Sequence, residues 1–203
     1  SDVVNSQYKK GVLELCVLSL LKKRDCYGYE ISEYLSQHID IADGTVYPIL
    51  RKLKADGLLT TYYVCCSSAF PNTFTFSEPW EAVYMAWFAA ACGYDGMLRW
   101  SYNSWPADPV RDSRFTAWPA GDTYLVYPDA RSSIRFERLR EGIQDYEKIR
   151  ILRGELASDN TPEGAAKRAE LEAAVRPFEA HDPARPWPDL LRRAKETLAR
   201  LSE

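Results

Sequence analysis

Apolar residues recur at helical spacing in three successive segments at the start of the chain. Residues 9–23 carry apolar side chains three and four positions apart, and residues 28–38 and 43–55 repeat this pattern. Gly57 follows the third segment as a residue that commonly ends a helix. Thr, Tyr and Val residues then predict a strand over residues 58–64. The pattern therefore predicts three helices followed by a strand.

The rest of the chain mixes longer helical patterns with short apolar runs. Residues 96–102 and 122–127 predict two buried parallel strands, joined by a long loop rich in Trp, Pro and Asp. Within the longest helix we expect Ile134, Phe136, Leu139, Ile143, Tyr146 and Ile149 to face inward. The predicted helices cover residues 77–92, 132–156, a segment that starts at Thr161 and Pro162, and about 187–201.

Three helices followed by a strand are typical of a winged helix-turn-helix, in which the third helix enters the major groove of DNA. The outward positions of this helix carry hydroxyl groups and cations, which bond phosphates and base edges. A solvent-exposed face of a small three-helix domain is an equally open interpretation. The outward residues are Thr45, Tyr47, Arg51, Lys52 and Lys54.

The loop between the two predicted strands carries the other candidate chemistry. Aromatic faces can stack on sugar rings, and polar side chains beside them can bond sugar hydroxyls, although large aromatics more often fill a core. A functional loop after a strand is also the arrangement of barrel enzymes. The candidate sugar-binding residues are Trp100, Tyr102, Asn103, Trp105, Asp112 and Arg114, with Trp118 nearby.

Composition divides the chain near Val64. The first 64 residues hold eight basic and eight acidic residues, so the later residues carry the whole net charge of −3. All six tryptophans also lie in the later part. We therefore expect two domains of different origin, residues 1–64 and 65–203.

Charge, cysteine content and hydropathy exclude several other classes of protein. No apolar run approaches the length of a membrane span, and the start of the chain lacks a signal-peptide pattern. The five cysteines show no metal-site spacing, which predicts reduced thiols. We expect a cytoplasmic protein with no cofactor, no metal and no membrane partner.

Three motifs in the first part resemble the PadR-like winged-helix transcriptional regulators. They are KGVLE at 10–14, YGYEI at 27–31 and GTVYPILRKL at 44–53, and the resemblance covers residues 8–64. It implies a dimeric, DNA-binding repressor, often with a small-molecule inducer. The basic wing strand of that family is missing, and residues 67–76 are the candidate substitute wing. The implied DNA-binding residues are Lys9, Lys10, Tyr29, Thr45, Tyr47, Arg51 and Lys52.

Motifs in the second part are similar to the C-terminal part of glycoside hydrolase family 123-like β-N-acetylgalactosaminidases. They include LRWSYNSWPADP at 98–109, FTAWPAGDTYLVYP at 115–128 and SSIRFERLREGIQDYEKIRIL at 132–152, and the resemblance covers about 62–203. It implies a (β/α)-barrel and hydrolysis assisted by the substrate's acetamido group, with an adjacent Asp-Glu pair. No Asp-Glu dipeptide occurs in this chain, so we expect no catalytic residue and no hydrolysis.

Together these patterns predict an α+β chain with an N-terminal winged helix-turn-helix and a C-terminal partial (β/α)-barrel segment with trailing helices. The main hypothesis is a chimeric or truncated PadR-type DNA-binding module with a catalytically incomplete glycosidase segment. The alternative is a carbohydrate-active fragment with a sugar-binding aromatic loop. Expected partners are double-stranded DNA, bound weakly, a carbohydrate, and a second copy through homodimerisation or self-association. Unpaired strand edges predict that the second part is the less stable one.

Overall fold

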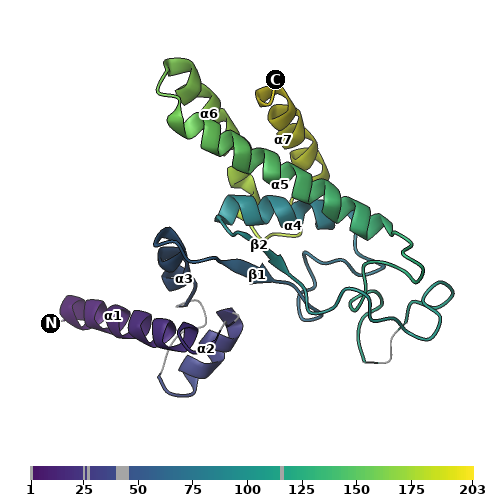
Figure 1. The fold of residues 1–203 in the computed structure, drawn as a ribbon, viewed down its shortest axis with the longest axis horizontal. Helices are drawn as coiled ribbons and strands as arrows, with labels where there is room; N and C mark the ends of the chain where they lie inside the picture. The colour runs from purple at the N-terminus through teal and green to yellow at the C-terminus, as the bar shows by residue number, and fades with distance from the viewer. Residues whose placement is uncertain (1, 25, 27, 40–45, 115–116) are drawn as a thin grey trace. The chain divides into compact units, whose positions relative to one another are not determined.

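The chain divides into two compact units, Ser1–Tyr62 (unit 1) and Tyr63–Glu203 (unit 2), each described by itself. The computed structural model describes all residues except 1, 25, 27, 40–45 and 115–116 (Figure 1). The side chains of residues 2–10, 29, 47 and 51 also lie outside the described part. Within that part, none of the helices has the length and the apolar run that a membrane crossing needs.

Unit 1 contains the three predicted helices. They are α1 (Asp2–Leu21), α2 (Gly28–Ser36) and α3 (Val46–Ala55), so α1 begins earlier than the apolar pattern predicts. Gly57 follows α3 with a positive φ of 96°. The buried side chains that hold the three helices together are aliphatic, as the helical spacing predicts. They are Leu13, Val17, Ile31, Leu35, Val46 and Leu53.

The predicted wing is absent from the described residues. Strand β1 (Thr61–Tyr63) pairs with β2 (Gly96–Leu98) and not with a strand that directly follows it. Residues 73–76 form no strand: residues 73 and 74 are irregular and residues 75 and 76 form a turn, because other partners take their backbone groups. Thr73 O accepts from the Arg135 side chain and Thr75 N donates to Ala120 O. The winged-helix expectation therefore finds no support in the structure.

Unit 2 is built around two adjacent helices. Helix α4 (Pro79–Cys92) and helix α5 (Ile134–Ser158) lie side by side in Figure 1. Three further helical segments complete the unit: α6 (Pro162–Val175), the 3₁₀-helix η1 (Arg176–Glu179) and α7 (Trp187–Leu201). The largest fully buried side chains join these helices into one core, among them Tyr84, Trp87, Phe178 and Trp187.

The inward face of α5 differs from the expectation at two isoleucines. Ile134 and Ile143 are 60% and 50% exposed, whereas Arg135 and Gly142, one position away from them, are buried. One residue turns a helix by about 100°, which is enough to carry a side chain from core to solvent. Buried polar residues occupy this face because other elements of unit 2 supply their hydrogen-bond partners.

Residues 122–127 form a turn, a bend and two isolated bridges where a parallel strand was expected. Only single antiparallel bridges occur there in the described structure, Asn103 with Tyr124 and Tyr127 with Arg131. The carbonyl of Asp122 accepts from the Arg99 side chain, and that of Thr123 accepts from Ser101 Oγ. Side chains thus use backbone groups that a continuous ladder needs.

Candidate functional site

A buried ion pair lies at the centre of the loops of unit 2. Arg99 Nη2 is 2.8 Å from Asp122 Oδ1, and the two side chains are 5% and 0% exposed. Arg99 also donates to the Asp122 carbonyl, and Trp100 Nε1 donates to the other carboxylate oxygen, Oδ2, at 3.0 Å. Burial lowers the pKa of Arg99 and the Asp122 charge opposes that shift. Asp122 therefore anchors both a cation and an indole ring.

The first turn of α4 holds one side of this ion pair through Asn72. Asn72 Oδ1 accepts from Arg99 Nη1 at 2.9 Å, and the Asn72 backbone N–H donates to Glu81 Oε2 at 2.9 Å. Glu81 Oε1 also accepts from the Glu78 backbone N–H in the helix cap. Burial raises the pKa of Glu81, and the two N–H donors oppose the shift. A helix end thus positions Asn72, which in turn orients Arg99.

The first turn of α5 holds the loops around this ion pair through Arg135. Its Nη1 donates to the carbonyls of Thr73, Gly121 and Tyr124 at 2.7, 2.9 and 2.8 Å. A side chain at position 121 cannot fit, because a Cβ there would lie 2.6 Å from Arg135 Nη1 and the φ of Gly121 is 83°. Gly121 is therefore the residue that lets the loop approach α5.

Two tryptophans are exposed beside the buried ion pair. Trp100 and Trp118 are 41% and 40% exposed, and their ring centroids are 5.0 Å apart at an angle of 60°. The Trp100 indole cannot rotate freely because its N–H is bonded to Asp122. Flat, rigid apolar surfaces with one fixed polar edge suit recognition of a ligand that has an apolar face.

The other predicted aromatic residues lie on the same loops, with partners of their own. Tyr102 is 48% exposed and packs edge-on against Phe136, with 6.0 Å between ring centroids. Trp105 is 37% exposed and donates from Nε1 to Val126 O at 2.7 Å. Asn103 is exposed and pairs through its backbone with Tyr124. Each is available at the surface, whereas Trp100 packs against Trp118.

Asp112 and Arg114 bind each other at the surface. The Arg114 Nε and Nη2 atoms donate to the two Asp112 carboxylate oxygens at 2.8 and 2.6 Å. Arg114 lowers the pKa of Asp112 to about 2. Asp112 is therefore ionised at neutral pH and cannot act there as a general acid.

Sequence reasoning missed the buried polar residues that hold the loops, namely Asn72, Glu81, Arg99 and Arg135. A usable signal was present for Arg135, because it lies seven residues before Gly142 and fourteen before Ile149 on the buried face of α5. No comparable signal marks Asn72 or Arg99. The ion-pair partner of Arg99 is Asp122.

Of the DNA-binding residues that the PadR resemblance implies, only Lys52 has a described side chain. Thr45 lies outside the described residues, as do the side chains of Lys9, Lys10, Tyr29, Tyr47 and Arg51. Lys52 is exposed, and its Nζ lies 2.6 and 2.7 Å from the two carboxylate oxygens of Glu14. This pairing neutralises the positive charge that a phosphate contact would need.

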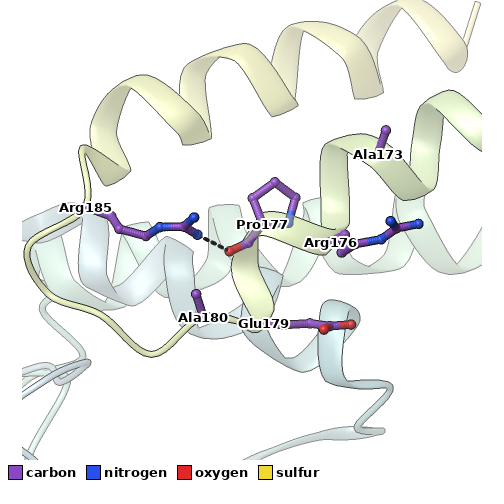
Figure 2. Close-up of a pocket in the computed structure, with 6 residues that line it drawn as sticks. All are labelled: Ala173, Arg176, Pro177, Glu179, Ala180 and Arg185. Carbon is purple, nitrogen blue, oxygen red and sulfur yellow. Dashed lines mark hydrogen bonds between the residues drawn. The ribbon is translucent and has the colours of Figure 1, made fainter.

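A metal site and a ligand pocket are the other two kinds of site to consider. Among the described residues, no group of three His, Cys, Asp or Glu side chains could hold a metal ion. A pocket of about 600 Å³ lies at η1, where Arg185 Nη1 donates to Pro177 O at 3.0 Å (Figure 2). Arg176 points away from Arg185 in this view, so the two cations do not converge on one ligand.

Comparison with known proteins identifies the family. The family model described as "Glycoside hydrolase 123, catalytic domain" matches residues 27–152, more than half of the chain. The fold is similar to that of a family 123 glycoside hydrolase from Clostridium perfringens, whose structure was solved to study glycolipid glycan hydrolysis. The TM-score is 0.63 at 24% identity, and the match covers 77% of this chain and 29% of that chain.

A second relative is "Uncharacterized protein X" of Lysinibacillus sphaericus, 31% identical over 65 residues. That match covers 30% of this chain and 60% of the relative. The chain thus spans less than two thirds of either protein. None of these matches supports the PadR resemblance, and the family match begins within unit 1, at residue 27. The chain belongs to the glycoside hydrolase 123 family.

Proposed function

We propose that unit 2 binds a glycan, with Trp100 and Trp118 as the surface on which a sugar ring stacks. The observation that carries this proposal is the exposed indole pair, in which the Trp100 ring is held by the buried Asp122–Arg99 ion pair. Membership of the glycoside hydrolase 123 family supports a sugar as the ligand. The Clostridium perfringens enzyme suggests a glycolipid glycan as the first ligand to test.

The proposed role is binding and not acid–base catalysis. Asp122 is fully buried and shared between Arg99 and Trp100, and Asp112 is paired with Arg114. Neither carboxylate is therefore free to exchange a proton with a substrate. In this proposal the loops supply an aromatic surface, and neither Asp112 nor Asp122 supplies a proton.

Binding is tested by titrating the full chain with an N-acetylgalactosamine-terminated glycan and following tryptophan fluorescence. Trp118→Ala should weaken binding about tenfold, the effect of about 1.4 kcal/mol. Tyr34→Ala is the matched control, because Tyr34 is a similarly exposed aromatic residue of unit 1, at 45%. Equal affinity of Trp118→Ala and the unaltered chain would exclude the tryptophan pair as the binding surface.

DNA binding by unit 1 is a second candidate. The supporting observation is a three-helix unit with its own core, in which Lys52 and Lys54 lie in the last turn of α3. The Glu14–Lys52 ion pair predicts weak binding, in the range of about 10⁻⁴ to 10⁻⁶ M typical of non-specific complexes.

A gel-shift series at two salt concentrations tests this second candidate. Glu14→Gln should strengthen duplex binding by releasing Lys52, and Arg51→Ala and Lys52→Ala should weaken it. Each lost phosphate contact lowers the salt slope by about 0.9. If all three variants bind as the unaltered chain does, α3 is not a DNA-contacting helix.

A further inference from the structure

Two adjacent cysteines follow β1. Cys65 and Cys66 are both free thiols and both half-buried. Cys65 Sγ lies 3.1 Å from Ser67 Oγ. By contrast, Cys16 and Cys26 pack against the aliphatic core of unit 1, where a small apolar side chain has a structural role. Cys65 and Cys66 are thus a vicinal dithiol at a partly accessible position.

The two thiols lie in different electrostatic surroundings. Burial raises the pKa of Cys66, and the charge of Asp122 and the neighbouring Cys65 raise it further. Cys66 therefore stays protonated at neutral pH. Cys65 Sγ instead lies beside the Ser67 hydroxyl, a group that can donate a hydrogen bond to the sulfur. This asymmetry is the one expected for an attacking thiol and a resolving thiol.

We propose that Cys65 and Cys66 are a thiol–disulfide exchange site for low-molecular-weight disulfides. Cys65 thiolate attacks one sulfur of the small disulfide RSSR, forms a protein–S–S–R bond and releases RS⁻. Cys66 then transfers its proton to RS⁻ and attacks the Cys65 sulfur, which releases a second RS⁻ that takes up a proton from water. In net terms two protein thiols are oxidised to one disulfide, and RSSR is reduced to two RSH.

The disulfide formed in this way is reversible. Adjacent Cα atoms are about 3.8 Å apart across a trans peptide, closer than in most disulfides. A strained disulfide is more easily reduced than a relaxed one. The proposed site therefore responds to the thiol–disulfide balance of its surroundings and does not act as a permanent cross-link.

The dithiol is connected to the tryptophan pair by consecutive hydrogen bonds. Cys65 O accepts from Asn72 Nδ2 at 2.9 Å, Asn72 Oδ1 accepts from Arg99 Nη1, and Arg99 pairs with Asp122, which holds the Trp100 indole. Formation of the Cys65–Cys66 disulfide changes the backbone at Cys65 and so shifts these hydrogen bonds. This second step, control of glycan affinity, rests on the proposed function of unit 2.

The experiment starts from a variant in which Cys16, Cys26 and Cys92 are replaced by serine. This protein is incubated at neutral pH with oxidised glutathione, and its intact mass is recorded. We expect the loss of two hydrogen atoms, fully reversed by dithiothreitol. With Cys66→Ser added, the reaction should stop at one glutathione adduct. With Cys65→Ser added, the adduct should form more slowly, because burial and the Asp122 charge keep the remaining Cys66 thiol protonated.

If the triple variant does not fold, peptide mapping of the unaltered chain shows which cysteines form a disulfide or carry glutathione. Glutathione adducts that form equally fast at both positions, covalent dimers, or no loss of hydrogen would each overturn the exchange site. Tryptophan fluorescence and glycan affinity are then compared between the oxidised and reduced forms. Oxidation without glycan binding by either form would overturn the proposed glycan function and leave the exchange site intact.

Discussion

At the scale of single residues, Asp122 decides whether the loops of unit 2 hold their shape. Its carboxylate accepts from Arg99 and Trp100 and is fully buried. Asp122→Ala leaves the Arg99 charge buried without its partner, which typically costs about 3–5 kcal/mol. We expect a loss of this size in the free energy of unfolding, measured by urea denaturation.

Asp112→Ala is the matched control for that prediction. It also removes an aspartate that pairs with an arginine, but both partners are exposed. Water replaces the lost partner there, so the free energy of unfolding should stay unchanged. A small effect of Asp122→Ala, similar to that of the control, would show that the buried ion pair does not hold the loops.

Tyr84 gives a pH dependence at the same scale. Its buried hydroxyl donates to Ala180 O at 2.6 Å, and burial raises its pKa above the ordinary value of about 10. The unfolded chain then loses this proton at lower pH than the folded chain does. The stabilisation is complete below about pH 10 and is lost as the pH rises above it. Urea denaturation between about pH 9 and about pH 11.5 should show this loss, and Tyr84→Phe should reduce it. An unchanged slope in Tyr84→Phe would contradict the assignment.

At the scale of elements, the contact between α4 and α5 depends on Gly142. A Cβ at position 142 would lie 3.0 Å from both Ala86 Cβ and Val83 O, so the two helices must move apart to admit it. Gly142→Ala should lower the free energy of unfolding by about 1–3 kcal/mol despite the better helix propensity of alanine.

Gly154 in the same helix is the control, because nothing lies within 4 Å of a Cβ placed there. Gly154→Ala should raise the free energy of unfolding by about 0.5–1 kcal/mol through helix propensity alone. Circular dichroism at increasing urea concentration measures both variants. Equal stabilisation by the two substitutions would mean that α4 and α5 are not closely packed at Gly142.

At the scale of the whole molecule, the two units should differ in resistance to proteases. The core of unit 2 contains Trp87, Phe178 and Trp187, whereas that of unit 1 consists of aliphatic side chains. Larger buried apolar area stabilises a domain more. Because the helices of unit 2 form a core of their own, we now expect unit 2 to be the more stable unit, which differs from the expectation drawn from the sequence.

Limited trypsin digestion followed by mass spectrometry measures this difference. We expect a resistant fragment that begins near Tyr63 and reaches the C-terminal residues, and faster loss of the fragment ending near Tyr62. Variants with reduced unit 2 stability, such as Asp122→Ala, should lose the resistant fragment first. Survival of unit 1 alone would contradict the prediction.

Local sequence determined the helices of this protein. Periodic apolar residues and end signals act over a few residues. Helix α4 therefore ends just before Gly93, and α6 begins after Thr161, whose hydroxyl accepts from Gly164 N. The same local rules correctly predicted the three helices of unit 1. The aromatic residues of the candidate site could also be predicted from the sequence. Tryptophan is rarely fully buried, and polar neighbours in the sequence favour a position at the surface.

Only the tertiary structure decided which partners hold that site. Asp122 and Arg99 are 23 positions apart, and Arg135 reaches Thr73 across 62 positions. No periodic pattern links such distant residues, so their hydrogen bonds became visible only in the folded chain. The same partners explain why residues 122–127 are not a strand and why Arg135 and Gly142, in place of Ile134 and Ile143, face the core. Sequence pattern sets local conformation, whereas burial of a polar group depends on partners that folding brings together from distant positions.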